Sequence, residues 1–183
     1  RQAISDYVNL ERGARATAGQ VLVLSSTRQA LYLCAQVLAD AHGPILMEDP
    51  GYFGARKAFE MAQLQVIPVP VDAHGLSIDH LRADRSGANT IYVTPSHQYP
   101  TGVTLALERR LALTAWAAER QGWIIEDDYD SQFHYAGLPT ACVQGLDTRQ
   151  RTIYLGTFAK SLYPGLRIGY MVLPPALVQA MTH

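Results

Sequence analysis

Lys160 is the residue of this chain best suited by type and place to covalent chemistry. The chain has only two lysines, Lys57 and Lys160. Lys160 stands in GTFAKSLYPGLRIGY (156–170), between an apolar run that predicts a strand and a turn rich in Gly and Pro. We expect partial desolvation there, which favours the neutral amine that Schiff-base chemistry needs.

A cluster of acids follows another apolar run, Trp-Ile-Ile. The segment EDDYDSQF (126–133) contains Glu126, Asp127, Asp128 and Asp130. Because side chains alternate along a strand, at least one of the first three should point inward. A buried carboxylate needs a cationic partner. A solvated turn or a divalent-metal site is the alternative interpretation.

Two segments could bind a phosphate. SSTRQAL (25–31) leads from a predicted strand into a helix, where the hydroxyls of Ser26 and Thr27 and free N–H groups favour an anion. Taken alone, this segment is better explained by simple helix capping. Thr157 and Arg167 flank Lys160, and arginine suits bidentate phosphate binding. GTFAKS lacks the spacing of a nucleotide-binding P-loop.

Two further residues follow predicted strands. Tyr52 comes directly after the Pro50-Gly51 turn and could stack on a planar ligand or open a helix as a core aromatic. His97, in TPSHQYPTG (94–102), could contact a ligand, although a structural histidine is the commoner case. No second His or Cys stands at zinc-binding spacing from it.

Together these residues describe one ligand. It has an aldehyde for Lys160, a phosphate for the hydroxyls and Arg167, a protonatable ring nitrogen for an inward Asp, and a flat face for Tyr52. Pyridoxal 5′-phosphate (PLP) matches this description.

The elements that must position these residues alternate along the chain. Short β-branched runs, such as 21–26, 44–49, 65–71 and 89–96, alternate with helical patterns such as 28–43, 52–63, 77–84 and 105–122. This alternation predicts an α/β domain with a mostly parallel, mixed sheet of about seven strands and helices on both faces. The last two strands should be antiparallel, because no helix fits between them. The prolines in 65–71 indicate an edge strand.

The composition excludes several classes of protein. The 183 residues are 48% hydrophobic and 17% charged with a net charge of −1, so this segment has no basic footprint for nucleic acid. Cys34 and Cys142 form no CxxC pair, and Cys34 reads as a buried free thiol. Without a signal peptide or a membrane-length apolar run, a cytoplasmic protein is the default expectation. Both ends look like cuts in a longer protein.

The motifs TPSHQYPTG, EDDYDSQF and GTFAKSLYPGLRIGY, with the looser match SSTRQAL, resemble a known family. Their order is similar to the large domain of fold-type I PLP-dependent enzymes, the aspartate aminotransferase superfamily. The amino-acid sequences of these motifs are most similar to those of the aminotransferase-like domain of MocR-type regulators, a GntR subfamily. The resemblance runs from about residue 3 to about residue 174.

The resemblance implies a role for each matching residue. Lys160 would form the internal aldimine, Asp127 would pair with the pyridine nitrogen, and Tyr129 would hydrogen-bond the ring O3′. Tyr52 would stack on the ring, and His97 and Gln98 would lie near it. The implied phosphate ligands are Ser26, Thr27, Thr157 and Arg167.

The resemblance also implies the rest of the protein. Tyr99 replaces the Asn that aminotransferases carry before the Pro-Thr-Gly turn, which favours a regulator. This chain would be the large domain alone, without the N-terminal winged-helix DNA-binding domain and the C-terminal small domain. We expect a homodimer that senses PLP or an amino compound. A genuine aminotransferase and a cofactor-free dimerisation platform are the alternatives.

Overall fold

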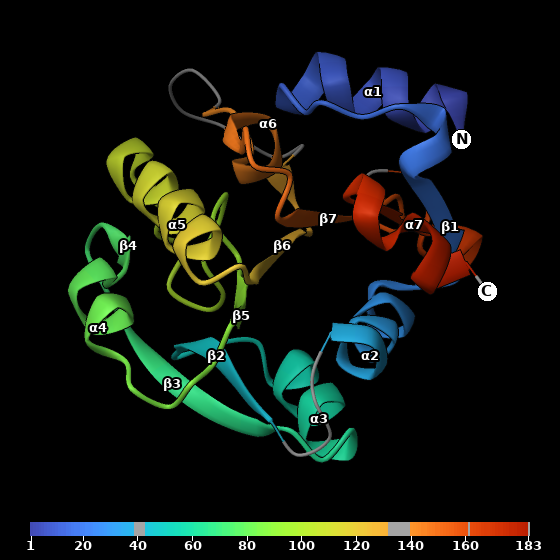
Figure 1. Ribbon diagram of the computed structural model, residues 1–183. Helices are drawn as coiled ribbons and strands as arrows, with labels where there is room; N and C mark the ends of the chain where they lie inside the picture. Colours follow the sequence, from blue (N-terminus) through green and yellow to red (C-terminus); the bar gives the residue numbers. More distant parts are fainter. Residues whose placement is uncertain (39–42, 132–139, 161, 183) are drawn as a thin grey trace.

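The computed structural model describes residues 1–38, 43–131, 140–160 and 162–182 (Figure 1). The strands are β1 (Val21–Leu24), β2 (Pro44–Asp49), β3 (Gln65–Asp72), β4 (Gly75–Leu76), β5 (Thr90–Val93), β6 (Trp123–Asp128), β7 (Thr152–Thr157) and β8 (Gly169–Val172). The helices are α1 (Gln2–Arg12), α2 (Thr27–Leu38), α3 (Phe53–Met61), α4 (Ile78–Ala83), α5 (Leu107–Glu119), α6 (Val143–Leu146) and α7 (Pro175–Thr182).

The strands form one sheet in the order β1-β8-β7-β6-β5-β2-β3-β4. The strands from β7 to β3 are parallel, β8 runs antiparallel between β7 and β1, and β4 runs antiparallel to β3. The predicted mostly parallel, mixed sheet and the antiparallel last pair are therefore confirmed. The sheet has eight strands, and the two-residue β4 is too short to leave a pattern in the sequence. β4 pairs outside the proline-containing β3, so β3 is next to the edge and is not the edge strand that its prolines indicated.

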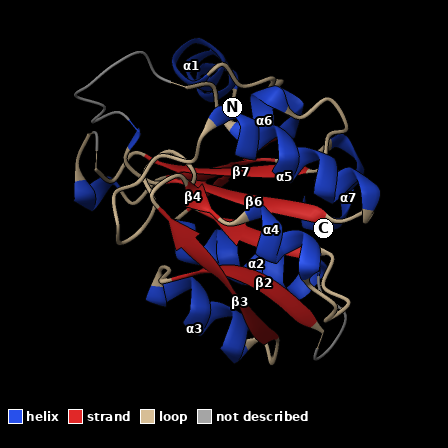
Figure 2. Cartoon of the chain, turned by 90° about the vertical axis from the view of Figure 1, so that its left-hand side faces the viewer, coloured by secondary structure: helices blue, strands red, loops and turns tan. Residues whose placement is uncertain are grey.

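Helices cover both faces of the sheet, as predicted (Figures 1 and 2). One face packs against α2, α3 and α7 in a core that includes Leu31, Phe59 and Leu177. The other face packs against α4 and α5, with Leu81 and Trp116 in its core. A third apolar cluster lies under α1. None of the helices in the described residues combines the length and the apolarity needed to cross a bilayer.

β6 shows how the sequence positions the acidic cluster. Ile125 belongs to the core under α2 and α3, and its neighbour Ile124 belongs to the core under α4 and α5. Since side chains alternate, Asp127 continues the face of Ile125, and Asp128 continues the face of Ile124. The two neighbouring aspartates therefore leave the sheet on opposite sides.

Candidate functional site

A cavity of about 480 Å³ opens at the carboxyl ends of the parallel strands, where open α/β sheets bind their ligands. Segments that follow β1, β2, β5, β6 and β7 all contribute to its wall. Its lining comprises Ser25, Ser26, Thr27, Arg28, Tyr52, Tyr92, Thr94, Tyr99, Asp127, Tyr129, Thr157, Ala159, Lys160, Arg167 and Ile168. The fold thus brings together eight of the nine predicted site residues, all except His97.

Asp127 forms the floor of the cavity. Its side chain is buried, and its Oδ2 accepts a 2.8 Å hydrogen bond from the Tyr92 hydroxyl. Its Oδ1 is also buried and has no hydrogen-bond partner among the described residues. Burial raises the pKa of Asp127 to about 6, and the Tyr92 hydrogen bond acts in the opposite direction. A buried carboxylate oxygen without a partner is costly, and a donor in the cavity would satisfy it.

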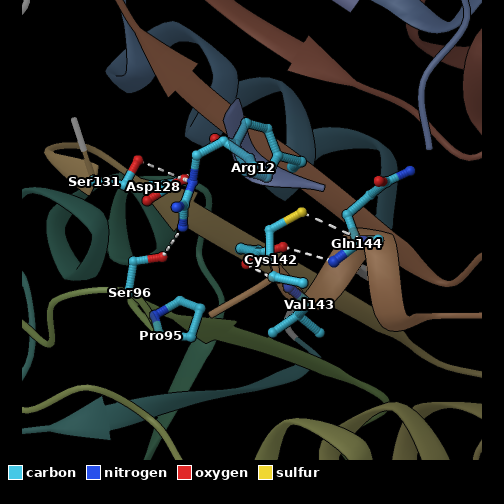
Figure 3. Close-up of polar contacts among 12 residues, drawn as sticks. Arg12, Pro95, Ser96, Asp128, Ser131, Cys142, Val143 and Gln144 are labelled. Atoms are coloured by element: carbon cyan, nitrogen blue, oxygen red, sulfur yellow. Dashed lines mark hydrogen bonds and ion pairs between the residues drawn. The ribbon is translucent and has the colours of Figure 1, made fainter. Parts of the chain in front are cut away.

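Asp128 lies behind the sheet in a different environment (Figure 3). Its Oδ2 accepts hydrogen bonds from Arg12 Nε at 2.7 Å, Ser131 Oγ at 2.9 Å and the Tyr154 hydroxyl at 2.5 Å. Arg12 is therefore the cationic partner that a buried carboxylate was expected to need. Among the described residues, no three His, Cys, Asp or Glu side chains converge as metal ligands would.

Lys160 stands at the rim of the cavity, with its ammonium 4.4 Å from the centre of the Tyr129 ring. The side chain is exposed, so the expectation of a desolvated lysine is wrong for this structure. The reason is that β7 ends at the buried Thr157, and the chain has already left the sheet when it reaches Lys160. Burial and nearby acids, Asp130 first, raise the pKa of Tyr129, so its phenol stays protonated and can donate.

The first turn of α2 forms the end of the cavity expected to bind phosphate. The Ser26 hydroxyl accepts a 3.2 Å hydrogen bond from the N–H of Gln29 and so caps α2, and Thr27 and Arg28 of the first turn line the cavity. A Cβ on Gly169 would lie 3.2 Å from the backbone nitrogen of Thr27, so glycine lets β8 pass close to this turn.

Thr157 and Arg167 line the same cavity from the other side. The Thr157 hydroxyl accepts a 3.1 Å hydrogen bond from the N–H of Ala159. Arg167 adopts a left-handed backbone conformation with φ 49° and is exposed. No carboxylate among the described residues pairs with it. A guanidinium in that position is free to bind an anion.

Aromatic rings wall the opening. The Tyr99 ring meets Tyr52 edge-on at 5.4 Å and Tyr129 edge-on at 6.3 Å. A Cβ on Gly54 would lie 2.4 Å from the Tyr52 ring, so glycine at position 54 lets this ring fold over α3. His97 is outside the cavity lining: its ring lies parallel to that of Tyr129, and its Nδ1 is 2.8 Å from Asp130 Oδ2.

Sequence reasoning missed some cavity residues. Tyr92 stood inside an apolar strand, and its hydroxyl was not considered, although alternation places it on the face of Ile125. Thr94 lines the cavity and donates to the buried Glu48, which was not singled out at all. Tyr99 was identified only as a departure from the aminotransferase pattern. The signal common to Tyr92 and Thr94 is their position at the carboxyl end of β5.

The residues present fit PLP. The unpartnered Asp127 oxygen, the N-terminus of α2 and the lysine at the rim match the ring nitrogen, the phosphate and the aldehyde of one molecule. They surround a single cavity that could hold all three groups together. This combination of sheet, cavity and lysine is that of the large domain of fold-type I PLP-dependent proteins.

The comparisons define the family. The chain matches the family described as aminotransferase class I and II over residues 1–183, and it belongs to that family. A solved kynurenine aminotransferase from Pyrococcus horikoshii, in complex with PMP, is 31% identical with a TM-score of 0.92 over 99% of this chain and 46% of that one. The family is PLP-dependent, so the cofactor predicted from the sequence is confirmed.

The curated relatives include transcriptional regulators. An uncharacterized HTH-type transcriptional regulator, YdeL of Bacillus subtilis, is 43% identical over 98% of this chain and 38% of its own length. The probable rhizopine catabolism regulatory protein MocR of Rhizobium meliloti is 41% identical over 97% of this chain and 36% of its own length. The predicted resemblance to MocR-type regulators is confirmed, and the chain spans less than two fifths of the length of these relatives.

Proposed function

We propose that this chain is the PLP-binding, effector-sensing domain of a MocR-type transcriptional regulator. The observation that carries the proposal is one cavity in which Lys160, the unpartnered Asp127 oxygen and the N-terminus of α2 converge. Identities of 41% and 43% to two regulators over nearly the whole chain support the choice of a regulator.

Each residue has a distinct task in this proposal. Lys160 supplies the amine that bonds covalently to the cofactor aldehyde, and Asp127 holds a proton at the pyridine nitrogen. Tyr129 donates to the ring oxygen O3′, and Tyr52 lies against the ring face. The phosphate is held by hydroxyls, N–H groups and a guanidinium, contributed by Ser26, Thr27, Thr157 and Arg167. His97 would act through Tyr129, against which its ring lies.

PLP bound in this way would make the site reactive toward primary amines. An arriving amino compound would take the place of the lysine amine on the cofactor, and Lys160 would then be a free amine at the rim of the cavity. A free lysine side chain there could make contacts that the bound one cannot, which is the local event that a conformational switch requires. A sensor needs only this exchange.

The remaining parts of the proposal concern the whole protein. An N-terminal winged-helix domain would bind DNA, and a C-terminal small domain would close over the cavity. The protein would work as a homodimer in the cytoplasm. The partial coverage of both regulators by this chain is consistent with additional domains.

A genuine aminotransferase is the second candidate. The likeness to the kynurenine aminotransferase favours it, and Lys160, Asp127 and Tyr129 all line the cavity. In that case the freed Lys160 would also move a proton between two carbons of the substrate. Tyr99 at the position of the aminotransferase Asn favours the regulator.

The experiment that tests the proposal maps the reactive lysine. The purified protein is mixed with PLP, reduced with borohydride, digested and analysed by mass spectrometry. We expect the label on Lys160, while Lys57, exposed and paired with Glu60 at 2.7 Å, serves as the internal control. Label on Lys57 alone, or on neither lysine, would contradict the proposal and leave the dimerisation platform. If the protein that reacts with PLP at Lys160 also converts amino acids to keto acids, that result would favour the aminotransferase.

A further inference from the structure

A buried ion pair lies directly behind the cavity. Arg12 is the last residue of α1, and its side chain reaches the carboxyl end of β6 to contact Asp128 at 2.7 Å (Figure 3). Both side chains are almost completely buried, with 6% and 0% exposure. Burying such a pair costs desolvation free energy, so it is weak as a device for stability alone. Another role for the pair is therefore worth testing.

The helix aims Arg12 by its spacing. Ser5, Val8 and Arg12 are the buried residues of α1, and they lie on one face because they are three and four positions apart. Gly13 ends the helix with φ 61°, a left-handed conformation that glycine adopts without strain. The Arg12 carbonyl accepts a 3.0 Å hydrogen bond from the N–H of Cys142, which fixes the end of α1 on the domain.

The contacts of Arg12 fall on two segments that also line the cavity. Asp128 stands between Asp127 and Tyr129, both of which line the cavity on the other side of the strand. The second contact is a 2.8 Å hydrogen bond from Arg12 Nη2 to Ser96 Oγ. Ser96 lies in the segment between Thr94 and Tyr99, which also line the cavity. The Arg12 guanidinium thus contacts two segments of the cavity wall, and both contacts lie outside the cavity.

The charge of Asp128 also acts on Asp127. Burial is the main cause that raises the pKa of Asp127, and the neighbouring charge of Asp128 adds to it. Arg12 offsets the Asp128 charge at 2.7 Å. Without Arg12, the carboxylate of Asp128 would be buried one residue from the group that is to hold a proton on the cofactor. That is an electrostatic reason, besides geometry, for an arginine in this place.

We infer that Arg12 is a positioning residue of the cofactor site: through Asp128 and Ser96 it sets the placement of Asp127, Tyr129 and the 94–99 segment. The inference rests on the proposed function, because it assigns a part of the PLP site. It also makes α1 a part of that site, although no residue of α1 lines the cavity.

The test compares PLP affinity, by spectroscopic titration, in the wild type, Arg12→Met, Arg12→Lys, Asp128→Asn and the double variant Arg12→Met/Asp128→Asn. Arg12→Met should weaken binding about 10- to 100-fold, by analogy with the loss caused by removing residues that orient a metal ligand. The double variant should recover part of the loss, because it leaves no uncompensated charge. The PLP affinity of Arg12→Lys should lie between those of the wild type and Arg12→Met, since lysine retains the charge but lacks the forked guanidinium that reaches Ser96.

Arg109→Met is the matched control. Arg109 also pairs with an aspartate, Asp72, through two 2.8 Å contacts, and it lies outside the cavity lining. We expect its PLP affinity to stay within about twofold of the wild type, as for substitutions without shared partners. Hydrogen exchange at residues 127–131 in the cofactor-free protein is the second readout, and it should be faster in Arg12→Met and unchanged in Arg109→Met.

The outcomes separate the two proposals. If the wild type binds no PLP, the proposed function fails and this inference with it. If the wild type binds PLP and Arg12→Met binds it equally well, with unchanged exchange at 127–131, the inference alone is overturned. If Arg12→Met does not fold, wild-type affinity in both Arg12→Lys and Asp128→Asn overturns it.

Discussion

Asp127 and Asp128 are neighbours on β6 and both are buried, yet their surroundings differ in almost every respect. Asp128 accepts three hydrogen bonds behind the sheet, one of them from the Arg12 guanidinium. Asp127 has one hydrogen bond, from Tyr92, and an oxygen without a partner among the described residues. Each aspartate keeps one buried oxygen without a partner among the described residues, but only Asp127 lines the cavity, so only its acceptor faces a ligand.

The difference shows how one strand serves two purposes. Alternation sends adjacent carboxylates to opposite faces, so the fold can pair one with a buried arginine and place the other in the cavity for the cofactor. An unsatisfied buried acceptor lowers the stability of the empty protein, and a ligand that supplies the donor recovers that free energy on binding. The four predictions below test this division between structure and ligand.

The largest effect should come from Asp128→Asn. Removing the negative charge leaves the Arg12 guanidinium buried without its counter-ion, which should lower the free energy of unfolding by about 3–5 kcal/mol. Urea unfolding of the cofactor-free protein measures this. Asp72→Asn removes an exposed partner of Arg109 and is the control, with a much smaller expected loss because exposed ion pairs stabilise little. Equal losses in the two variants would contradict the comparison.

Glu48 extends the comparison to pH. It is buried at the end of β2, where burial raises its pKa to about 7, and the hydrogen bonds from Thr94 and Gln98 only partly offset this. Since the folded pKa lies above the ordinary value of 4.5, this group stabilises the fold at low pH and loses that contribution as pH rises from about 4.5 to above 7.

At about 1.36 kcal/mol per pKa unit, the lost contribution of Glu48 is about 3 kcal/mol. Glu48→Gln should therefore flatten the fall in unfolding free energy between pH 5 and pH 8 by a similar amount. Urea unfolding at several pH values measures the slope. Glu60→Gln, at an exposed glutamate, should leave the slope unchanged. A wild-type slope in Glu48→Gln would show that the carboxyl ionises normally in the fold.

Asp127→Asn should affect the ligand rather than the fold. The variant removes the negative acceptor for the ring nitrogen, and a hydrogen bond to a charged group contributes about 1.5–3 kcal/mol. PLP affinity should fall by a corresponding factor of about 10 to 150. The free energy of unfolding without cofactor should be unchanged or higher, because a buried charge is gone. A large loss of stability with normal PLP binding would reverse the roles assigned to the two aspartates.

The smallest effect should come from the aromatic wall. Tyr52→Leu removes the ring that would lie against the cofactor, and such a ring contact contributes about 0.5–1.5 kcal/mol beyond the area it buries. We expect PLP to bind about 2- to 15-fold more weakly. Tyr32→Leu, at an exposed tyrosine of α2 outside this cavity, is the matched control. The same affinity in both variants would exclude a stacking role for Tyr52.

Local patterns in the sequence predicted the sheet and the place of the cavity. The β-branched runs predicted the strands, and the residues just beyond their ends predicted where a ligand would lie, because parallel strands end at one edge of the sheet. The family resemblance singled out Asp127 rather than Asp128, and alternation along β6 places Asp127 in the lining of the cavity. The roles of the individual site residues remain predictions.

Other features depend on partners that no local pattern specifies. Arg12 and Asp128 are 116 positions apart, and only the packed fold brings α1 to the end of β6. Lys160 was expected to be desolvated from the apolar run before it, but exposure depends on how far the chain has left the sheet. Glu48 reads as an ordinary polar residue before a turn until the segment with Thr94 and Gln98 folds over it.

A crystal structure of the protein grown with PLP tests the central claim most directly. The account predicts continuous electron density from Lys160 Nζ to the cofactor, the phosphate at the first turn of α2, and the ring nitrogen about 2.6–3.2 Å from Asp127 Oδ1. PLP joined to Lys57, PLP with its ring nitrogen away from Asp127, or a cavity without PLP at saturating concentration would contradict it.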